Sequence, residues 1–223
     1  MKERNTIPKA TIERLPLYYR CLDKLSTFEN VDVISSKALG GRLGIPSTQV
    51  RKDLSYYGEF GRRGVGYDVN SLKRSVAKIL GIDKTRSAVI VGAGNLGRAL
   101  VNYEGFNKMG LEIKSVFDND LNKIGNRVGS IKVKSMKEFE DVLSEEDIKL
   151  GIITVPATAA QRVAEKLVNA GVKAIWNFAP TRLKLPEEIT VRNEDLAVGI
   201  VSLIYHLNWQ EELEEREEET EEN

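Results

Sequence analysis

A glycine-rich segment in the middle of the chain has the residue types and spacing that bind a pyrophosphate. The strand-forming run Ser87–Val91 leads into it, and a helix-forming run containing Leu100 and Val101 follows. In a G-x-G-x-x-G loop between a strand and a helix, the first glycine makes the tight turn, the second lets a pyrophosphate approach the backbone, and the third lets helix and strand pack closely. The loop residues expected to bind a dinucleotide are Gly92, Ala93, Gly94, Asn95, Leu96 and Gly97.

An acidic residue ends the next expected strand. The run Ile113–Phe117 is followed by Asp118, 21 residues after Gly97. A carboxylate at this place accepts hydrogen bonds from the adenosine ribose hydroxyls and repels the additional phosphate of NADP. Asp120 lies near enough to compete for this role, but Asp118 is better placed at the strand end. The pattern therefore predicts NAD and NADH as the cofactors.

Strand-forming and helix-forming runs continue to alternate after this point. Leu150–Thr154 is apolar and β-branched, Thr158–Ala170 has helical spacing, and Ala174–Phe178 is typical of another strand. This alternation predicts an α/β fold with a doubly wound parallel sheet, in which ligands bind at the carboxyl ends of the strands. The residues expected there, around the nicotinamide half of the cofactor, are Thr154, Val155, Pro156 and Asn177.

Two short helices joined by a tight turn are expected before this domain. Ser35 or Ser36 can cap the first helix, which Gly44 ends, and Ser47 can cap the second helix after a turn containing Pro46. Such a pair is typical of a helix-turn-helix, whose second helix enters the major groove of DNA. The side chains of the second helix that could contact bases and phosphates are Ser47, Thr48, Gln49, Arg51, Lys52, Ser55 and Tyr56.

A stretch with four glycines, residues 58–69, follows and predicts a short hairpin, or wing. Arginines at a glycine-rich tip suit a narrow minor groove of DNA. A solvated basic hairpin with no ligand is the alternative interpretation. The wing residues expected to contact DNA are Arg62, Arg63, Gly64 and Tyr67.

Helical patterns also occupy both ends of the chain. Apolar residues recur at helical spacing between Ile12 and Leu25, and Pro16 is expected to start or kink that helix. Residues 196–207 are apolar nearly all round a helix, which needs cover on more than one side. A partner subunit is the expected cover, and packing against the chain's own sheet is the alternative. The tail after Trp209 is nearly all glutamate and is expected to be solvated and frayed.

Charge is distributed unevenly, although the net charge is zero. Residues 1–82 carry 15 Lys and Arg against 8 Asp and Glu, residues 83–205 carry 17 against 16, and residues 206–223 carry 1 against 9. A basic first segment suits a polyanion. We therefore predict a winged-helix DNA-binding domain at 1–82, a Rossmann NAD(H)-binding domain at 83–194, a C-terminal dimerisation helix at 195–210 and an acidic tail at 211–223.

Composition argues against several other classes of protein. No apolar run approaches the roughly 20 residues of a membrane helix, the charged first residues lack the apolar core of a signal peptide, and the single cysteine, Cys21, permits no internal disulfide. A cytoplasmic location is therefore expected. No His/Cys cluster could hold a metal, and the one histidine, His206, lies in the apolar C-terminal helix. A catalytic acid or base has no good candidate, so the chain is not expected to be an enzyme.

Four motifs together resemble the Rex family of redox-sensing transcriptional repressors. They are QVRKDLSYYGEFGRRGVGY at 49–67, VGAGNLGRAL at 91–100, TVPA at 154–157 and NFAP at 177–180. The resemblance extends from about residue 7 to residue 208 and leaves out the acidic tail. It implies a winged helix that binds a palindromic operator in double-stranded DNA and a Rossmann domain that senses the NADH/NAD ratio, with NADH releasing the operator. It also implies a homodimer with exchanged C-terminal helices.

The resemblance further implies a switch between the two domains. Arg20, Tyr103 and Asp195 match a network that ties the DNA-binding domain to the cofactor domains in the family. Tyr103 is therefore also counted among the cofactor-binding residues, and Leu196 is expected near the nicotinamide of the partner subunit. Two other functions fit the same motifs: an NAD-dependent oxidoreductase with a regulatory N-terminal domain, and a nucleotide- or CoA-binding module whose basic domain contacts a protein.

Overall fold

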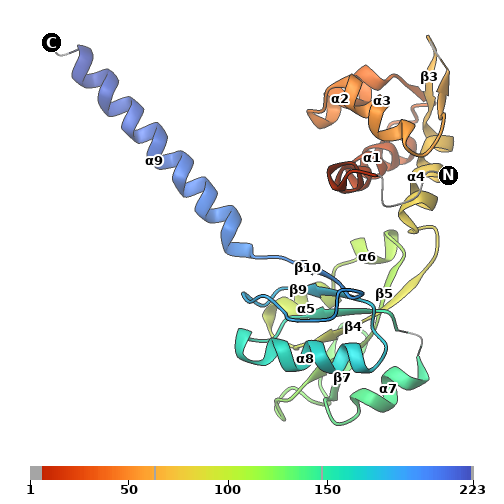
Figure 1. Ribbon diagram of the computed structural model, residues 1–223, viewed down its shortest axis with the longest axis vertical. Coiled ribbons are helices and arrows are strands. Elements are labelled where there is room, and N and C mark those ends of the chain that lie inside the picture. The colour runs from red at the N-terminus through yellow and green to blue at the C-terminus, as the bar shows by residue number, and fades with distance from the viewer. Residues whose placement is uncertain (1–6, 63, 147, 222–223) are drawn as a thin grey trace. The chain divides into compact units, whose positions relative to one another are not determined.

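The computed structural model describes residues 7–62, 64–146 and 148–221, with side chains up to residue 214. The chain divides into two compact units, Met1–Thr85 and Arg86–Asn223 (Figure 1). The first unit is a helical bundle with a small sheet, and the second is a sheet with helices on both faces. The expected domain boundary, near residue 82, lies just before the boundary between these units.

The first unit packs four helices against a three-stranded antiparallel sheet. In this sheet β3 lies between β1 and β2, so β2 and β3 form the hairpin expected after the helix-turn-helix. The elements are α1 (Lys9–Thr27), β1 (Val33–Ile34), α2 (Ser36–Leu43), α3 (Ser47–Ser55), β2 (Gly61–Arg62), β3 (Gly66–Asp68) and α4 (Val69–Leu80). Their apolar faces meet in one core, whose buried members include Leu15, Leu22, Leu39, Val50, Leu54 and Leu72.

Local signals set the ends of the two helices of the helix-turn-helix. Ser35 caps α2 by accepting a hydrogen bond from the Ala38 N–H at 3.1 Å, and Gly44 ends the helix in a left-handed conformation with φ of 66°. The predicted cap at Ser47 is wrong, because α3 begins with Ser47 itself and Pro46 precedes it without a side-chain cap. The Pro46 carbonyl instead accepts hydrogen bonds from the N–H groups of Gln49 and Val50, at 2.9 and 3.1 Å.

The first helix passes through its proline. It begins at Lys9, so the expectation that it might start at Pro16 is wrong. Proline removes one backbone hydrogen bond, but packing of a buried face on both sides of it outweighs that loss. The buried residues of this face are Thr11, Leu15, Tyr18, Leu22 and Leu25.

A fully buried carboxylate joins α1 to α3. Arg14 donates two hydrogen bonds to Asp53, from Nε at 2.6 Å and from Nη2 at 2.7 Å. Thr11 Oγ1 donates at 2.9 Å, and Tyr18 Oη and Gln49 Nε2 each donate at 2.7 Å. Burial by itself would raise the pKa of Asp53, but these donors, Arg14 first among them, lower it to about 2. A charged acceptor therefore fixes α3 against α1.

The second unit is built on a seven-stranded sheet in the order β10-β9-β8-β4-β5-β7-β6. All neighbouring strands are parallel except β6 and β7, which are antiparallel. The strands are β4 (Arg86–Val91), β5 (Leu111–Asp118), β6 (Arg127–Val128), β7 (Ile131–Ser135), β8 (Leu150–Ile153), β9 (Ala174–Asn177) and β10 (Thr190–Asn193). The helices are α5 (Asn95–Val101), α6 (Gly105–Lys108), α7 (Phe139–Glu145), α8 (Ala157–Asn169) and α9 (Leu196–Glu221).

Alternate residues of the central strand β4 face opposite helical layers. Val89 and Val91 pack in one buried cluster with α7 and α8, whereas Ile90 packs in a second cluster against which α5 lies. From β4 the chain order runs outward in both directions, to β8 on one side and to β5 on the other. In doubly wound sheets such a switch point opens a crevice at the carboxyl ends of the strands, where ligands bind. The topology therefore predicts a ligand site at the end of β4.

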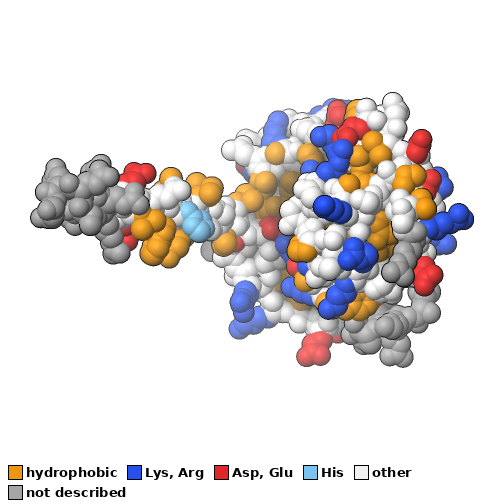
Figure 2. Space-filling view, turned by 90° about the horizontal axis from the view of Figure 1, so that it is seen from above, with side chains coloured by type: hydrophobic (Ala, Val, Ile, Leu, Met, Phe, Trp, Pro, Cys, Tyr) orange, Lys and Arg blue, Asp and Glu red, His pale blue; other side chains and the backbone are white. Residues whose placement is uncertain are grey.

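The last helix leaves its apolar side chains uncovered. The aliphatic residues from Leu196 to Leu207 have exposed fractions between 49% and 68%, and hydrophobic side chains line α9 in the space-filling view (Figure 2). The helix also continues beyond Trp209 to Glu221, where a frayed tail was expected, because glutamate is a good helix former. No helix in the described part of the chain has both the length and the apolarity to cross a membrane.

The Asp53 network predicts an acid-sensitive first unit. The folded-state pKa of about 2 lies below the unfolded value of about 3.9. The carboxylate therefore stabilises the fold fully above the unfolded pKa, and this contribution is lost as the pH falls through the folded pKa. We expect Asp53→Asn to lower the unfolding midpoint at neutral pH and to flatten its further fall between about pH 5 and about pH 2.

Thermal unfolding followed by circular dichroism at several pH values measures this effect. Both tryptophans, Trp176 and Trp209, lie in the second unit, so their fluorescence reports that unit separately and serves as the internal control. Parallel pH curves for the wild type and the variant would contradict the assignment.

Candidate functional site

The three glycines of the loop after β4 have different surroundings. Gly92 has φ of 111°, and a Cβ atom there would lie 2.7 Å from the Thr154 carbonyl oxygen. A Cβ atom on Gly97 would collide with the Gly92 carbonyl, so helix and strand could not pack as they do. A Cβ atom on Gly94 would meet no atom within 4 Å. Two glycines are therefore required by the fold, and Gly94 leaves open the space through which a pyrophosphate would approach.

Side chains at the ends of the two strands that flank β4 hold the glycine loop by hydrogen bonds. Thr154, at the end of β8, donates from Oγ1 to the Gly92 carbonyl at 2.8 Å. Asp118, at the end of β5, accepts a hydrogen bond from the Ala93 N–H at 2.8 Å. The structure therefore brings together three of the sequence-predicted groups, namely the loop, Thr154 and Asp118. Thr154 therefore holds the loop by a hydrogen bond to its backbone. Its position in the sequence did not indicate this role.

Asp118 is held as a carboxylate by donors at both oxygens. The Asp120 N–H donates to Oδ1 at 2.9 Å, and Lys123 Nζ donates to Oδ2 at 3.1 Å. Burial opposes ionisation, but the backbone donors of Asp120 and Ala93 and the Lys123 ammonium together lower the pKa of Asp118. A charged carboxylate at this strand end is the group that would accept ribose hydroxyls. Sequence reasoning missed Lys123, because it lies in an irregular segment with no periodic signal.

The remaining residues predicted near the cofactor fall into two groups. Asn177 is fully buried, and its amide donates to the carbonyls of Ala179 and Thr181 and to Asn193, so it braces the turn after β9. The others follow the ends of β4 and β8 and have at least part of their surface accessible. These are Asn95 and Leu96 at the start of α5, and Val155 and Pro156 after β8.

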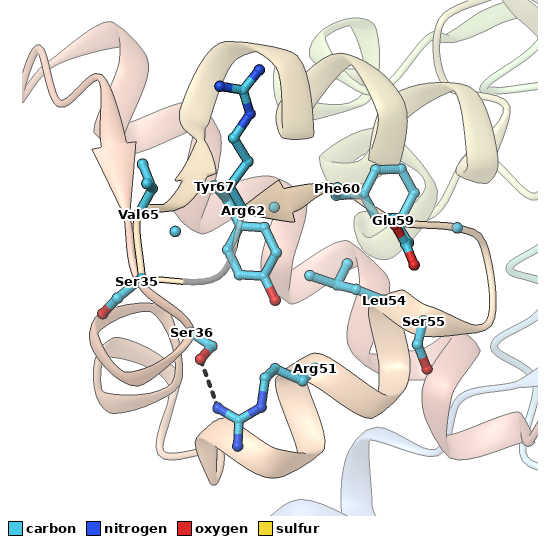
Figure 3. A pocket seen from close by; sticks show the side chains of 14 residues that line it. Ser35, Ser36, Arg51, Leu54, Ser55, Glu59, Phe60, Arg62, Val65 and Tyr67 are labelled. Carbon is cyan, nitrogen blue, oxygen red and sulfur yellow. Dashed lines mark hydrogen bonds between the residues drawn. The ribbon is translucent and has the colours of Figure 1, made fainter.

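The helix-turn-helix and the wing enclose a hollow of about 650 Å³ (Figure 3). Arg51 of α3 donates to Ser36 Oγ of α2 at 2.9 Å across one end of it. Tyr67 is buried in the core, with its ring directed from the wing towards α3, and burial raises its pKa. Arg62 points away from the hollow along the wing. The hollow is therefore bordered by the Arg51 guanidinium group and by hydroxyl groups of Ser36, Ser55 and Tyr67.

Exposure separates the other residues predicted to contact DNA. Thr48, Arg51, Lys52 and Ser55 are exposed on α3, whereas Ser47, Gln49 and Tyr56 are partly buried. Gly64 lies between β2 and β3 with φ of 82°, a conformation that favours glycine. Arg63 lies outside the described residues. The contacts of all these residues with DNA remain predictions.

The three predicted switch residues belong to different parts of the chain. Arg20 lies on α1 in the first unit. Tyr103 follows α5, is 53% exposed, and packs edge-on against Phe106 with ring centroids 5.0 Å apart. Asp195 precedes α9 and accepts the Ala197 N–H at 2.9 Å, next to the exposed Leu196. Within the described chain no group of three or more His, Cys, Asp or Glu residues could hold a metal ion.

Comparisons with known proteins agree with this two-part organisation. Residues 6–55 match the family of putative DNA-binding protein N-termini, and residues 83–181 match the CoA binding domain. The chain is 48% identical over 201 residues to the redox-sensing transcriptional repressor Rex of Carboxydothermus hydrogenoformans, covering 90% of this chain and 96% of the relative. The chain belongs to the Rex family. Rex of Clostridium beijerinckii is 43% identical over 208 residues, which cover 93% and 98% of the two chains.

Solved Rex-family structures are similar over the same length. RSP, crystallised with β-NAD+ and operator DNA, is 39% identical and superposes with a TM-score of 0.87, covering 94% of this chain and 96% of its own. RSP with β-NADH gives 37% identity and a TM-score of 0.84, covering 94% and 98%. The family and the fold class predicted for this Rex chain are therefore confirmed. Exchange of α9 between subunits remains a prediction.

The glycine loop gives a matched pair of variants. Gly94→Ala should keep the thermal midpoint of the wild type, since a methyl group meets no protein atom there, but should lose NADH binding, because it fills the space at the loop. Gly97→Ala should lower the midpoint by several degrees, because overpacking costs about 1–3 kcal/mol. Thermal unfolding and titration of NADH fluorescence measure the two effects. Wild-type NADH affinity in Gly94→Ala would show that the dinucleotide does not approach this loop.

Proposed function

We propose that the protein is a redox-sensing transcriptional repressor that binds double-stranded operator DNA through its first unit and NAD+ or NADH through its second. A rise in NADH relative to NAD+ releases the operator. The observation that carries this proposal is the similarity, over 94% of the chain, to a solved repressor complex that contains both β-NAD+ and operator DNA. The open glycine loop and the exposed face of α3 support it. We place the protein with its operator in the cytoplasm.

A titration of DNA binding at constant total NAD(H) tests this function. Duplexes are first selected from a random library in the presence of NAD+. Affinity for the selected duplex should then fall as the NADH fraction rises, while a scrambled duplex binds weakly at every ratio. An affinity that does not depend on the ratio would contradict the proposal.

An NAD-dependent oxidoreductase is the main alternative. Hydride transfer generally needs an acid or base beside the reacting carbon. The single histidine, His206, lies on the exposed helix α9, and Cys21 belongs to the first unit. We therefore infer a regulator without turnover, and consumption of NADH with candidate carbonyl substrates would contradict this.

Asp118 should set the preference for NAD(H) over NADP(H). Its carboxylate would accept the ribose hydroxyls and repel a 2′-phosphate, and Lys123 would offset only part of that repulsion. Asp118→Ala should weaken NADH binding and reduce the discrimination against NADPH. Asp120→Ala tests the competing acid, because that carboxylate accepts from Asn122 and pairs with Lys123 at 3.7 Å but accepts no N–H group of the loop. Equal affinity of the wild type for NADH and NADPH would contradict the assignment.

We propose a homodimer in which α9 is exchanged between subunits. Burial of a Leu, Ile or Val side chain contributes roughly 1.5–3 kcal/mol, and α9 leaves a series of them exposed in the single chain. A two-fold dimer would present two α3 helices to the half-sites of a palindrome, about 34–36 Å apart. The dimer can hold this spacing only if the second units set the positions of the first units.

The charge of the nicotinamide ring supplies the free-energy difference between the two cofactors that the switch needs. The oxidised nicotinamide ring carries a positive charge and resists burial in an apolar pocket, whereas the reduced ring is neutral. We propose that NADH favours a closed dimer with the wrong spacing and that NAD+ favours an open one. Moving the population from 1:99 to 99:1 needs roughly 10⁴-fold differential affinity, about 5.5 kcal/mol. Two sites would each supply about 2.7 kcal/mol, the size of one buried charge difference with a rearranged ion pair.

Arg20, Tyr103 and Asp195 are the contacts that we propose to exchange in this switch. Tyr103→Phe and Asp195→Asn should therefore weaken the effect of NADH on DNA binding more than they weaken NADH binding itself. Asp141→Asn, an exposed change on α7, is the control. Both affinities and the solution scattering of the dimer are measured with each cofactor. Fully NADH-responsive variants, or one dimer shape with both cofactors, would refute this mechanism.

A further inference from the structure

Gln49 is held by a charged residue of its own helix. It lies in the first turn of α3, is partly buried, and donates from Nε2 to Asp53 Oδ1 at 2.7 Å. Asp53 follows one helical turn later, so both side chains occupy the same face of the helix. One end of the amide therefore lies in the buried network, while the side chain as a whole is partly accessible.

The carboxylate determines which way the amide faces. Asp53 is ionised and can only accept hydrogen bonds, and Arg14 and Tyr18 already fix the position of its oxygens. A flipped Gln49 would put its carbonyl oxygen against this carboxylate, with two acceptors face to face. Only the orientation with Nε2 towards Asp53 is therefore compatible with the network. This leaves Oε1 as an acceptor and the second hydrogen of Nε2 as a donor.

We infer that Gln49 reads an adenine in each operator half-site and that Asp53 is the positioning residue for this contact. The inference deepens the proposed DNA-binding function and depends on it. In the major groove adenine presents an N6 donor beside the N7 acceptor, which matches an oriented acceptor and donor with two hydrogen bonds. Guanine presents two acceptors there, and each pyrimidine offers one hydrogen-bonding group. Adenine is therefore the base that satisfies both remaining groups of the amide.

Base preference distinguishes this role from a purely structural one. Affinities of the full-length protein with NAD+ are measured for the selected duplex and for variants with each base pair at every position. The wild type should prefer adenine at one position per half-site by about tenfold or more. Gln49→Ala should remove the preference at that position alone. Lys52→Ala is the comparison: if Lys52 contacts phosphate, its loss should weaken all duplexes alike and reduce the salt slope by about one.

Two further variants test the positioning role. Asp53→Asn can donate as well as accept, so both amide orientations become possible and adenine preference should disappear. Gln49→Glu keeps Asp53 and tests the site even where Asp53→Asn does not fold. A second carboxylate presents only acceptors to the ionised Asp53, so repulsion should turn it away from the network and the adenine preference should be lost.

The outcomes separate the two claims. If the wild type binds no selected duplex, the proposed function fails, and this inference fails with it. If the wild type binds but Gln49→Ala keeps the complete base profile, only the adenine contact is overturned. If folded Asp53→Asn keeps the adenine preference, or if Gln49→Glu keeps it, the positioning role of Asp53 is overturned.

Discussion

The buried carboxylate of Asp53 is the interaction on which the first unit most depends. It accepts five hydrogen bonds, of which the two from Arg14 form a bidentate ion pair, and it joins α1 to α3 within an otherwise apolar core. Apolar packing by Val50 and Leu54 is non-directional, whereas this network specifies the rotation of α3 about its axis. We therefore expect the recognition helix to move with α1 as one body. A signal from the second unit would act by displacing the whole first unit, which is the kind of motion that changes half-site spacing.

The two cofactors expected in the second unit differ only at the nicotinamide ring, which limits where the unit can tell them apart. NAD+ and NADH have the same pyrophosphate and the same adenosine ribose, so the open loop at Gly94 and the carboxylate of Asp118 would hold both equally. A group that binds two states equally shifts no equilibrium between them. Discrimination must therefore arise at the nicotinamide, which we expect at the far strand ends and beside the segment leading into α9. We therefore propose that the glycine loop supplies affinity and that Tyr103, Asp195 and Leu196 sense the redox state.

The sequence allowed prediction of features that depend on neighbouring residues. The turn at Gly92, the close packing at Gly97 and the end of α2 at Gly44 each follow from local backbone geometry, and all were expected. The Asp53 network was missed because its partners on α1 lie 35 to 42 residues away. Strands β6, β7 and β10 and helix α7 were missed because their short runs mix charged and apolar residues. The cap of α3 was misassigned to Ser47. A serine side chain there could accept hydrogen bonds from the same N–H groups that the Pro46 carbonyl accepts in the structure.

In the proposed switch, NADH and the operator oppose each other through one shared equilibrium of the dimer. Thermodynamic linkage requires the coupling to be reciprocal. The most direct test is therefore the affinity of the intact protein for NADH, measured with and without a saturating selected duplex. If the switch works in this way, the duplex should weaken NADH binding by the same factor by which NADH weakens duplex binding. Equal NADH affinity with and without the duplex would contradict it.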